Sequence, residues 1–263
     1  MAPQPVQAAG LRLALWQGRS PAGHAPRGIE DIATALAAAG AAGAAMLTGP
    51  EVWLPGYNHA AIPELAQPRG GDWHRALAEA CRSAGCGLVL GYAERAGTAV
   101  HNAAVAFDAR GHEVAHYRKI QLYGPREKAL YRPGEAYATF DIAGRKAALL
   151  ICYDIEFAPH IAALADQGVQ IIFCPTANMA PFTHVARATV PAMAANHALT
   201  IVYANFCGSE GDLDYVGMSL IAGPDGEVIA SAGAGPALLI ADLPAAYDPA
   251  RLSTQAQDFR KVR

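Results

Sequence analysis

Short apolar runs alternate with longer amphipathic segments along most of the chain. The apolar runs have strand length and are bounded by Gly, Pro and Asp. They cover residues 11–17, 43–48, 86–94, 101–108, 146–154, 169–177, 199–206 and 216–226. Segments of helix length lie between several of them, at 29–40, 73–85, 158–168 and 182–198. Three of these segments end in glycine, which predicts C-terminal caps at Gly40, Gly85 and Gly168.

Two pairs of neighbouring runs predict β-hairpins. Turn residues lie at 108–111 in AVAFDARGHEVAHYRK and at 224–226 in SLIAGPDGEVIASAG. Hairpins mixed with strand–helix alternation predict an α/β fold with mixed sheets, in which helices cover one face of a sheet and a second sheet packs on the other. No low-complexity linker or repeat divides the chain, so one domain over residues 1–263 is expected. Its polar tail, 244–263, is expected to wrap a partner subunit or to stay loose.

Composition and charge narrow the classes of function. The net charge is −3, and no Lys/Arg cluster offers a field for phosphates or anionic lipids, so nucleic acid is not expected as a partner. The chain is 52% hydrophobic and 16% charged, which suggests extra buried surface at a subunit interface. No membrane-spanning run or secretory signal is recognisable, and the five cysteines are an odd number. We therefore expect a cytoplasmic protein that forms a homodimer or a higher homo-oligomer.

Three side chains that could carry out acyl transfer lie next to apolar runs. They are Glu51, Lys119 and Cys152. A thiol needs a base to become a nucleophile, and a developing oxyanion needs a cation or a donor to stabilise it. Each residue also has an ordinary explanation when taken alone: a buried cysteine, an exposed loop glutamate and a solvated lysine. Their order and placement together predict one active site of an enzyme.

The sequence around these residues resembles a known family. PEVWLPGY, YRKIQLYGPREKALYRPG and LLICYDIEF are similar to the three signature regions of the nitrilase superfamily, the carbon–nitrogen hydrolases. The resemblance extends from LRLALWQ to SLIAGPDGEVIA. It implies a four-layer αββα sandwich, a dimer, and a Glu-Lys-Cys triad that works without a cofactor. No metal site is expected either, because no CxxC pair or HExxH helix is present.

The resemblance also implies roles for individual residues. Glu51 would be the general base, Lys119 the cation that stabilises the oxyanion, and Cys152 the nucleophile. Glu127, eight residues after Lys119, matches a further glutamate that positions the substrate in many members. Candidates for binding the small amide substrate are Tyr153, through its backbone N–H, and Tyr57, Tyr123, Asn178 and Met179.

The sequence leaves the substrate open. Cys152-Tyr153-Asp154 resembles the amidase and carbamoylase branches, whereas nitrilases usually have Cys-Trp-Glu. A cofactor-independent amidase of small non-peptide amides is the leading hypothesis. The alternatives are an N-carbamoyl amino-acid amidohydrolase, and a catalytically silent binding protein on the same fold.

Some positions depart from the family pattern. Gly49 replaces the usual Phe before Pro-Glu. Met193, Asn196 and His197 lie where Arg, Glu and Asn are common, which puts a buried ion pair in doubt. His160, close to Cys152 in sequence, also raises the less favoured possibility of a Cys-His protease.

Overall fold

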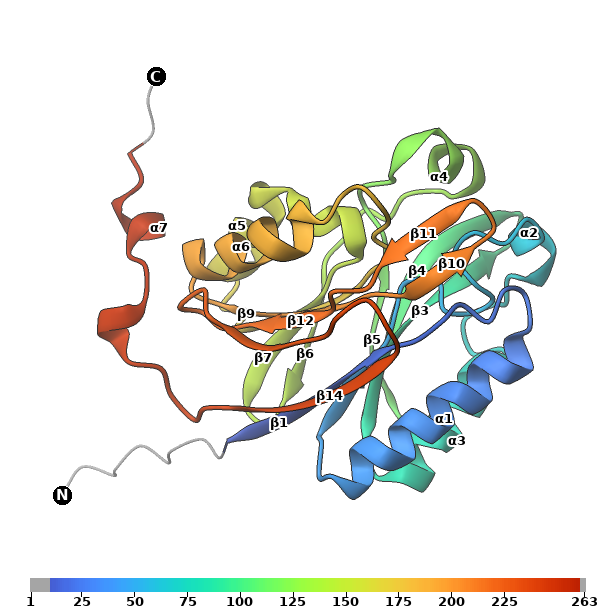
Figure 1. Ribbon diagram of the computed structural model, residues 1–263, viewed down its shortest axis with the longest axis horizontal. Helices are drawn as coiled ribbons and strands as arrows, with labels where there is room; N and C mark the ends of the chain where they lie inside the picture. Colours follow the sequence, from blue (N-terminus) through green and yellow to red (C-terminus); the bar gives the residue numbers. More distant parts are fainter. Residues whose placement is uncertain (1–9, 261–263) are drawn as a thin grey trace.

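Two six-stranded sheets stack face to face in the computed structural model, which describes residues 10–260 (Figure 1). The first sheet has the order β14-β1-β2-β3-β4-β5 and the second has the order β13-β12-β9-β8-β7-β6. The strands of the first sheet are β1 (Leu11–Gln17), β2 (Met46–Thr48), β3 (Gly87–Ala96), β4 (Ala99–Phe107), β5 (Glu113–Arg118) and β14 (Ala237–Leu243). Those of the second are β6 (Ala138–Ile142), β7 (Arg145–Leu149), β8 (Ile171–Pro175), β9 (Thr200–Ala204), β12 (Leu220–Ala222) and β13 (Val228–Ser231). A separate hairpin is formed by β10 (Cys207–Glu210) and β11 (Leu213–Val216).

Both sheets have a parallel middle and antiparallel edges. In the first sheet β1, β2 and β3 are parallel, and β14, β4 and β5 pair antiparallel beside them. In the second sheet β7, β8 and β9 are parallel, while β6, β12 and β13 pair antiparallel. The parallel pairs are joined by helices, as such crossovers require, and both predicted hairpins form as β4–β5 and β12–β13. The mixed α/β prediction is confirmed.

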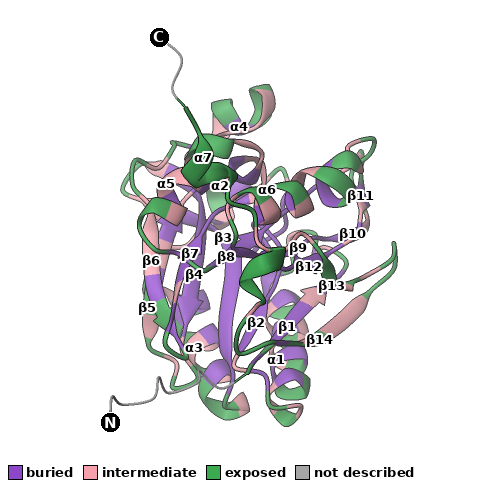
Figure 2. Ribbon diagram, turned by 90° about the vertical axis from the view of Figure 1, so that its left-hand side faces the viewer, coloured by how far each residue is buried: buried purple, intermediate pink, exposed green. Residues whose placement is uncertain are grey.

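Helices cover the outer faces of the two sheets. The helices are α1 (Ala25–Ala41), α2 (Ile62–Leu65), α3 (Asp72–Ala84), α4 (Gly124–Leu130), α5 (Ala158–Asp166), α6 (Val190–Asn196) and α7 (Gln255–Asp258). The sides of α1 and α3 that face the first sheet are buried, and their outer sides are exposed (Figure 2). α5 and α6 lie on the second sheet in the same way, so the order of layers is αββα.

The core follows the alternation of side chains along the strands. Leu13 and Leu15 point between the two sheets, whereas Ala14 packs with the buried residues Ile32 and Leu36 of α1. Successive side chains of a strand point to opposite faces, so each apolar strand contributes to both clusters. This explains why the strands have apolar runs rather than alternating polar and apolar residues.

Four details differ from the sequence prediction. The run 146–154 is not one strand: β7 ends at Leu149, and Cys152–Glu156 form a 3-10 helix. The chain turns there because Asp154 accepts a hydrogen bond from the backbone N–H of Ile151, three residues earlier (3.0 Å). The run 216–226 keeps only β12 as a strand, because Gly217 and Met218 have positive φ.

The predicted glycine cap at Gly40 is also wrong. Gly85 is a left-handed C-terminal cap, and Gly168 has positive φ two residues beyond α5, but Gly40 lies inside α1. A Cβ on Gly40 would collide with the carbonyl oxygen of Ala84, at the end of α3. Its role is to let two helices approach closely.

The segment 182–198 divides into a π-helical turn, Val185–Thr189, followed by α6. Over the described range 10–260, no helix is both long and apolar enough to cross a bilayer.

Candidate active site

Polar side chains gather where strands of both sheets end. Glu51 follows β2, and Lys119 follows β5, which runs in the same direction as β2. Cys152 and Asn178 come three residues after β7 and β8, two parallel strands of the second sheet. The two groups meet because the backbone N–H of Glu51 donates to the carbonyl oxygen of Thr176 across the sandwich (3.3 Å). Such a crevice at strand ends is the usual place for a site in an α/β sheet.

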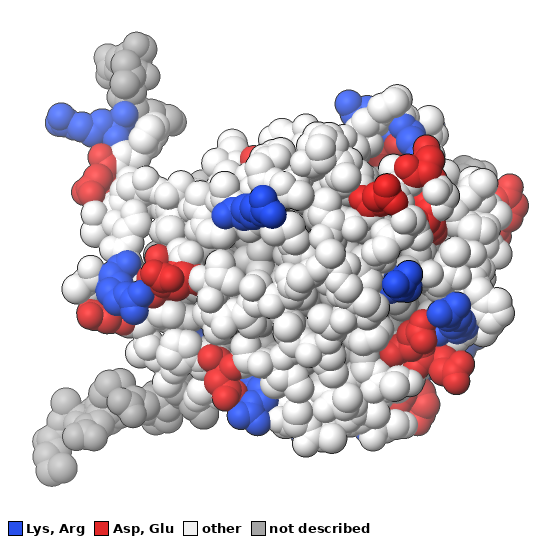
Figure 3. Space-filling view, viewed as in Figure 1, with Lys and Arg blue, Asp and Glu red and all other residues white. Residues whose placement is uncertain are grey.

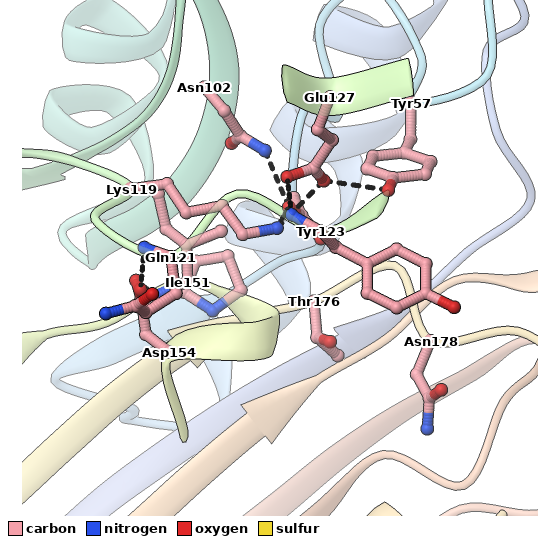
Figure 4. A network of polar contacts seen from close by, with 12 residues as sticks. Tyr57, Asn102, Lys119, Gln121, Tyr123, Glu127, Ile151, Asp154, Thr176 and Asn178 are labelled. Atoms are coloured by element: carbon pink, nitrogen blue, oxygen red, sulfur yellow. Dashed lines mark hydrogen bonds and ion pairs between the residues drawn. The ribbon is translucent and has the colours of Figure 1, made fainter. Parts of the chain in front are cut away.

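Lys119 is fully buried and lies between two buried glutamates. Its Nζ donates to Glu51 Oε1 at 2.6 Å. It also donates to Glu127 Oε1 at 2.8 Å (Figure 4). Glu127, on α4, is held further by the hydroxyl of Tyr57 (2.7 Å) and the backbone N–H of Tyr123 (2.8 Å). Asn102 on β4 donates to Glu51 Oε1 at 2.6 Å. The positions of Glu51, Lys119 and Glu127 are thus fixed by hydrogen bonds from other segments of the chain.

This cluster contains two carboxyl groups and one ammonium group. Burial raises the pKa of Glu51 to about 7, and the charge of Glu127 raises it too, while Lys119 and Asn102 oppose the shift. Burial lowers the pKa of Lys119, but Glu127 and Glu51 raise it more strongly, so the lysine stays protonated. Glu51 Oε2 is buried and has no hydrogen-bond partner among the described residues. A carboxyl group of this kind can exchange a proton near neutral pH.

Cys152 differs from the other cysteines. All five lie within residues 10–260, and four are buried, whereas Cys152 is partly exposed at a cavity. Its φ of +45° is unusual for a residue other than glycine and marks a strained turn between β7 and the 3-10 helix. Burial raises the pKa of the thiol, the charge of Glu51 raises it further, and Lys119 lowers it. The resting group is therefore a thiol that needs a base.

Asp154 connects the turn at Cys152 to the first sheet. Its Oδ1 accepts from the backbone N–H of Gln121 (2.7 Å; Figure 4). Its Oδ2 accepts from the Tyr117 hydroxyl (2.8 Å). Gln121 is two residues after Lys119, so one buried carboxylate sets the distance between the segments that carry the lysine and the cysteine. Burial raises the pKa of Asp154, and Lys119 and these hydrogen bonds lower it.

A cavity of about 230 Å³ opens at Cys152. All five residues predicted to bind substrate lie on its wall, together with three further side chains. The wall consists of Tyr57, Tyr123, Cys152, Tyr153, Glu156, Asn178, Met179, Phe182 and His184. Tyr123 packs edge-to-face against Tyr153, with ring centroids 5.3 Å apart, so much of the wall is aromatic. A cavity of this size suits a small molecule with an apolar body.

Several residues with structural roles in the site were not singled out from the sequence. Asn102 and Thr176 contact Glu51, and the buried side chain of Asn205 accepts from the backbone N–H of Asn178 (2.8 Å). A polar residue in an otherwise apolar run is the one signal that could have identified Asn102 and Asn205, because buried polar groups need partners. Thr176 acts through its backbone carbonyl, which no sequence pattern reveals.

Other candidates lie away from the site. Met193, Asn196 and His197 are on or next to α6, and no ion pair within residues 10–260 involves them. His160 uses its two ring nitrogens on Tyr137 (2.7 Å) and Gln121 (3.0 Å) and does not line the cavity with Cys152. In the same range, no three His, Cys, Asp or Glu side chains are arranged to hold a metal ion.

Known proteins resemble this chain over most of its length. The sequence model of the carbon-nitrogen hydrolase family matches residues 12–251. A hydrolase in the pqqF 5′ region of Pseudomonas protegens is 38% identical, covering 75% of this chain and 71% of the relative. An (R)-stereoselective amidase of Pseudomonas sp. is 33% identical over 72% of this chain and 69% of its own. A 2-oxoglutaramate amidase of Bacillus subtilis is 30% identical over 72% and 73%.

Solved structures of amidases also resemble this chain over nearly its whole length. The crystal structure of an amidase from Nesterenkonia sp. has a TM-score of 0.88 and 33% identity, and covers 99% of this chain and 97% of that one. A mutant of the Nesterenkonia sp. AN1 amidase in complex with butyramide has the same TM-score and identity, with coverage of 97% and 95%. The chain belongs to the carbon-nitrogen hydrolase family, in the amidase-like branch of the nitrilase superfamily.

Proposed function

We propose that this protein hydrolyses small non-peptide amides through a thioester on Cys152 and releases ammonia and a carboxylic acid. The observation that carries the proposal is the buried Lys119, bonded to both Glu51 and Glu127 beside a partly exposed thiol. Family membership supports the reaction class. The geometry supports the role of each residue.

The first half of the reaction forms the thioester. Glu51 Oε2 takes the thiol proton of Cys152, and Sγ attacks the amide carbonyl carbon. An ammonium has three N–H donors, and Lys119 uses two of them on the glutamates, so the third is available to the oxyanion. The backbone N–H of Tyr153 is the second donor. When the C–N bond breaks, Glu51 returns the proton and ammonia leaves.

The second half releases the acid. Glu51, ionised again, takes a proton from water, and the hydroxide attacks the thioester carbonyl. The same two donors hold the second oxyanion. The C–S bond then breaks, and the thiolate takes the proton back from Glu51. Glu127 keeps Lys119 and Tyr57 in place through its hydrogen bonds to both.

Ammonia release tests this proposal. We expect turnover of butyramide or a related small amide, and a loss of at least about 10³-fold in Cys152→Ala, because the nucleophile is removed. Cys207→Ala, which changes a buried cysteine outside the cavity, is the matched control and should keep its activity. Carbon dioxide released with ammonia from N-carbamoyl amino acids would identify the alternative hydrolase.

A chain without activity and with an unreactive Cys152 would contradict the proposal. If the purified chain releases no ammonia from amides, carbamoyl amino acids or nitriles, and Cys152 does not react with iodoacetamide, then the protein is a binding protein on this fold. The names of the relatives leave the acyl group open, because 2-oxoglutaramate is an anionic amide and butyramide is a neutral one.

A further inference from the structure

The cavity wall contains an acidic side chain but no lysine or arginine. Among its nine described wall residues are a carboxylate, Glu156, and a histidine, His184, but no lysine or arginine. His184 is exposed to solvent, where screening weakens the effect of any charge on it. Lys119 faces two glutamates, so the triad adds no net positive charge. A substrate carboxylate would therefore find no cation with which to pair.

Glu156 is positioned close to the nucleophile. It ends the 3-10 helix that begins at Cys152, and a rise of about 2 Å per residue places it roughly 8 Å along the helix axis. The side chain is half-buried and makes no hydrogen bond or ion pair within residues 10–260. Burial raises its pKa, and His184 and Lys119 lower it. An unpaired carboxylate on a cavity wall affects any charged group that enters the cavity.

The neighbouring cavity does not compensate for this charge. It has a volume of about 150 Å³, shares Tyr57, Tyr123 and Met179 with the first, and contains Arg126 and Asp212. The guanidinium of Arg126 is held by the carbonyl oxygen of Tyr57, to which it donates (2.9 Å), and by the ring of that tyrosine, over which it lies. Asp212 supplies an opposite charge in the same cavity. The net charge of Glu156, Arg126 and Asp212 on the walls of the two cavities is therefore negative.

We propose that Glu156 determines which acyl groups this enzyme accepts, by admitting neutral and cationic amides and rejecting amides that carry a carboxylate. The inference rests on the proposed amidase function and narrows its substrate class. It favours simple aliphatic amides and amino-amides over the ω-amides of dicarboxylic acids and over N-carbamoyl amino acids, which all carry a carboxylate.

Three amides of nearly equal size test the charge preference. Butyramide is neutral, β-alaninamide has an ammonium in place of the terminal methyl, and succinamate has a carboxylate there. At pH 8, we expect kcat/KM for succinamate to be at least about tenfold below that for butyramide, because like charges at this distance repel measurably. β-Alaninamide should be turned over at least as well as butyramide, allowing for the fraction of its amine that is protonated.

Glu156→Gln keeps the size of the side chain and removes the charge. In this variant we expect the ratio of succinamate to butyramide to rise by about tenfold and the ratio of β-alaninamide to butyramide to fall. Glu30→Gln makes the same chemical change at an exposed position on α1 and should leave both ratios unchanged. Equal turnover of succinamate and butyramide by the wild type, or unchanged ratios in Glu156→Gln, would overturn the inference.

Alkylation of Cys152 tests the same charge effect without turnover. The thiol displaces iodide from neutral iodoacetamide or from anionic iodoacetate, and mass spectrometry of the peptide that contains Cys152 measures both rates. Relative to free cysteine, iodoacetate should be disfavoured by about tenfold in the wild type and less so in Glu156→Gln. If no amide is hydrolysed but this selectivity is present, the proposed function fails and the charge preference stands; equal relative rates refute the charge preference alone.

Discussion

At the scale of single residues, the site depends on an imbalance of charge. One ammonium, on Lys119, serves two buried carboxyl groups, and burial penalises the second negative charge. This is why the pKa of Glu51 rises to about 7 while Lys119 remains a cation. Burial raises the pKa of Cys152, and the same Glu51 raises it further, which favours a resting thiol over a preformed thiolate.

The pH dependence of activity follows from this imbalance. The proposed mechanism needs ionised Glu51, so kcat/KM should fall as pH falls through about 7, by about tenfold per unit below it. Glu51→Gln should lose about 10²–10⁴-fold in rate, the usual contribution of a general base, and should lose this acid limb as well. The profile is measured between pH 4 and 8 with a neutral amide. An acid limb that persists in Glu51→Gln would assign the titration to another group.

At the scale of elements, close packing of strands fixes the catalytic turn. Gly91 on β3 donates its backbone N–H to the carbonyl oxygen of Pro50 (3.0 Å). A Cβ at Gly91 would lie 2.5 Å from the Cα of Glu51, which is backbone and cannot move aside cheaply. The first sheet thus directly supports the backbone at Glu51.

Gly91→Ala tests this support, because we expect it to lower both the free energy of unfolding and kcat. Overpacking should cost about 1–3 kcal/mol of unfolding free energy, and displacing Glu51 should lower kcat by at least about tenfold. Gly235→Ala, where an added Cβ meets nothing within 4 Å, is the control and should be close to wild type in both. Chemical denaturation and steady-state rates measure the two effects. Normal activity in Gly91→Ala would mean that the turn adjusts without displacing the base.

At the scale of the whole molecule, exposed apolar side chains collect towards the C-terminus. Of the four large ones within residues 10–260, Val228 lies in β13, Ile240 lies in β14, and Phe259 directly follows α7. Charged side chains lie mainly around the margin of the face seen in Figure 3, and α7 stands away from the sandwich in Figure 1. Surfaces of this kind are typical of subunit interfaces.

The oligomeric state should therefore depend on the tail. We expect sedimentation velocity to give a dimer or larger assembly for the full chain, and removal of residues 253–263 to shift it towards the monomer. Phe259→Ser should act in the same direction because it removes the most exposed of these side chains, at 74%. Val114→Ser, the same kind of change on β5, is the control. A full chain that stays monomeric over a wide range of concentrations would contradict the expectation.

Local patterns in the sequence were sufficient for much of the fold. Apolar runs, turn residues and glycine caps located most strands and helices, because they depend on neighbours a few residues apart. They failed at 146–154, where a hydrogen bond to Asp154 turns the chain, and at Gly40, where the requirement comes from a second helix. The resemblance to a family then supplied the roles expected of Glu51, Lys119 and Cys152 and the four-layer αββα arrangement.

By itself, the sequence determined which chemical groups were available and that each catalytic candidate lay beside an apolar run. Only the tertiary structure decided that one Lys119 serves both Glu51 and Glu127, that Asn102 and Asp154 hold the segments together, and that Glu156 lies unpaired on the cavity wall. These contacts join residues far apart in sequence, such as Asn102 and Glu51, 51 positions apart. Burial and pairing of charge follow from how the two sheets stack, and no local pattern encodes that arrangement.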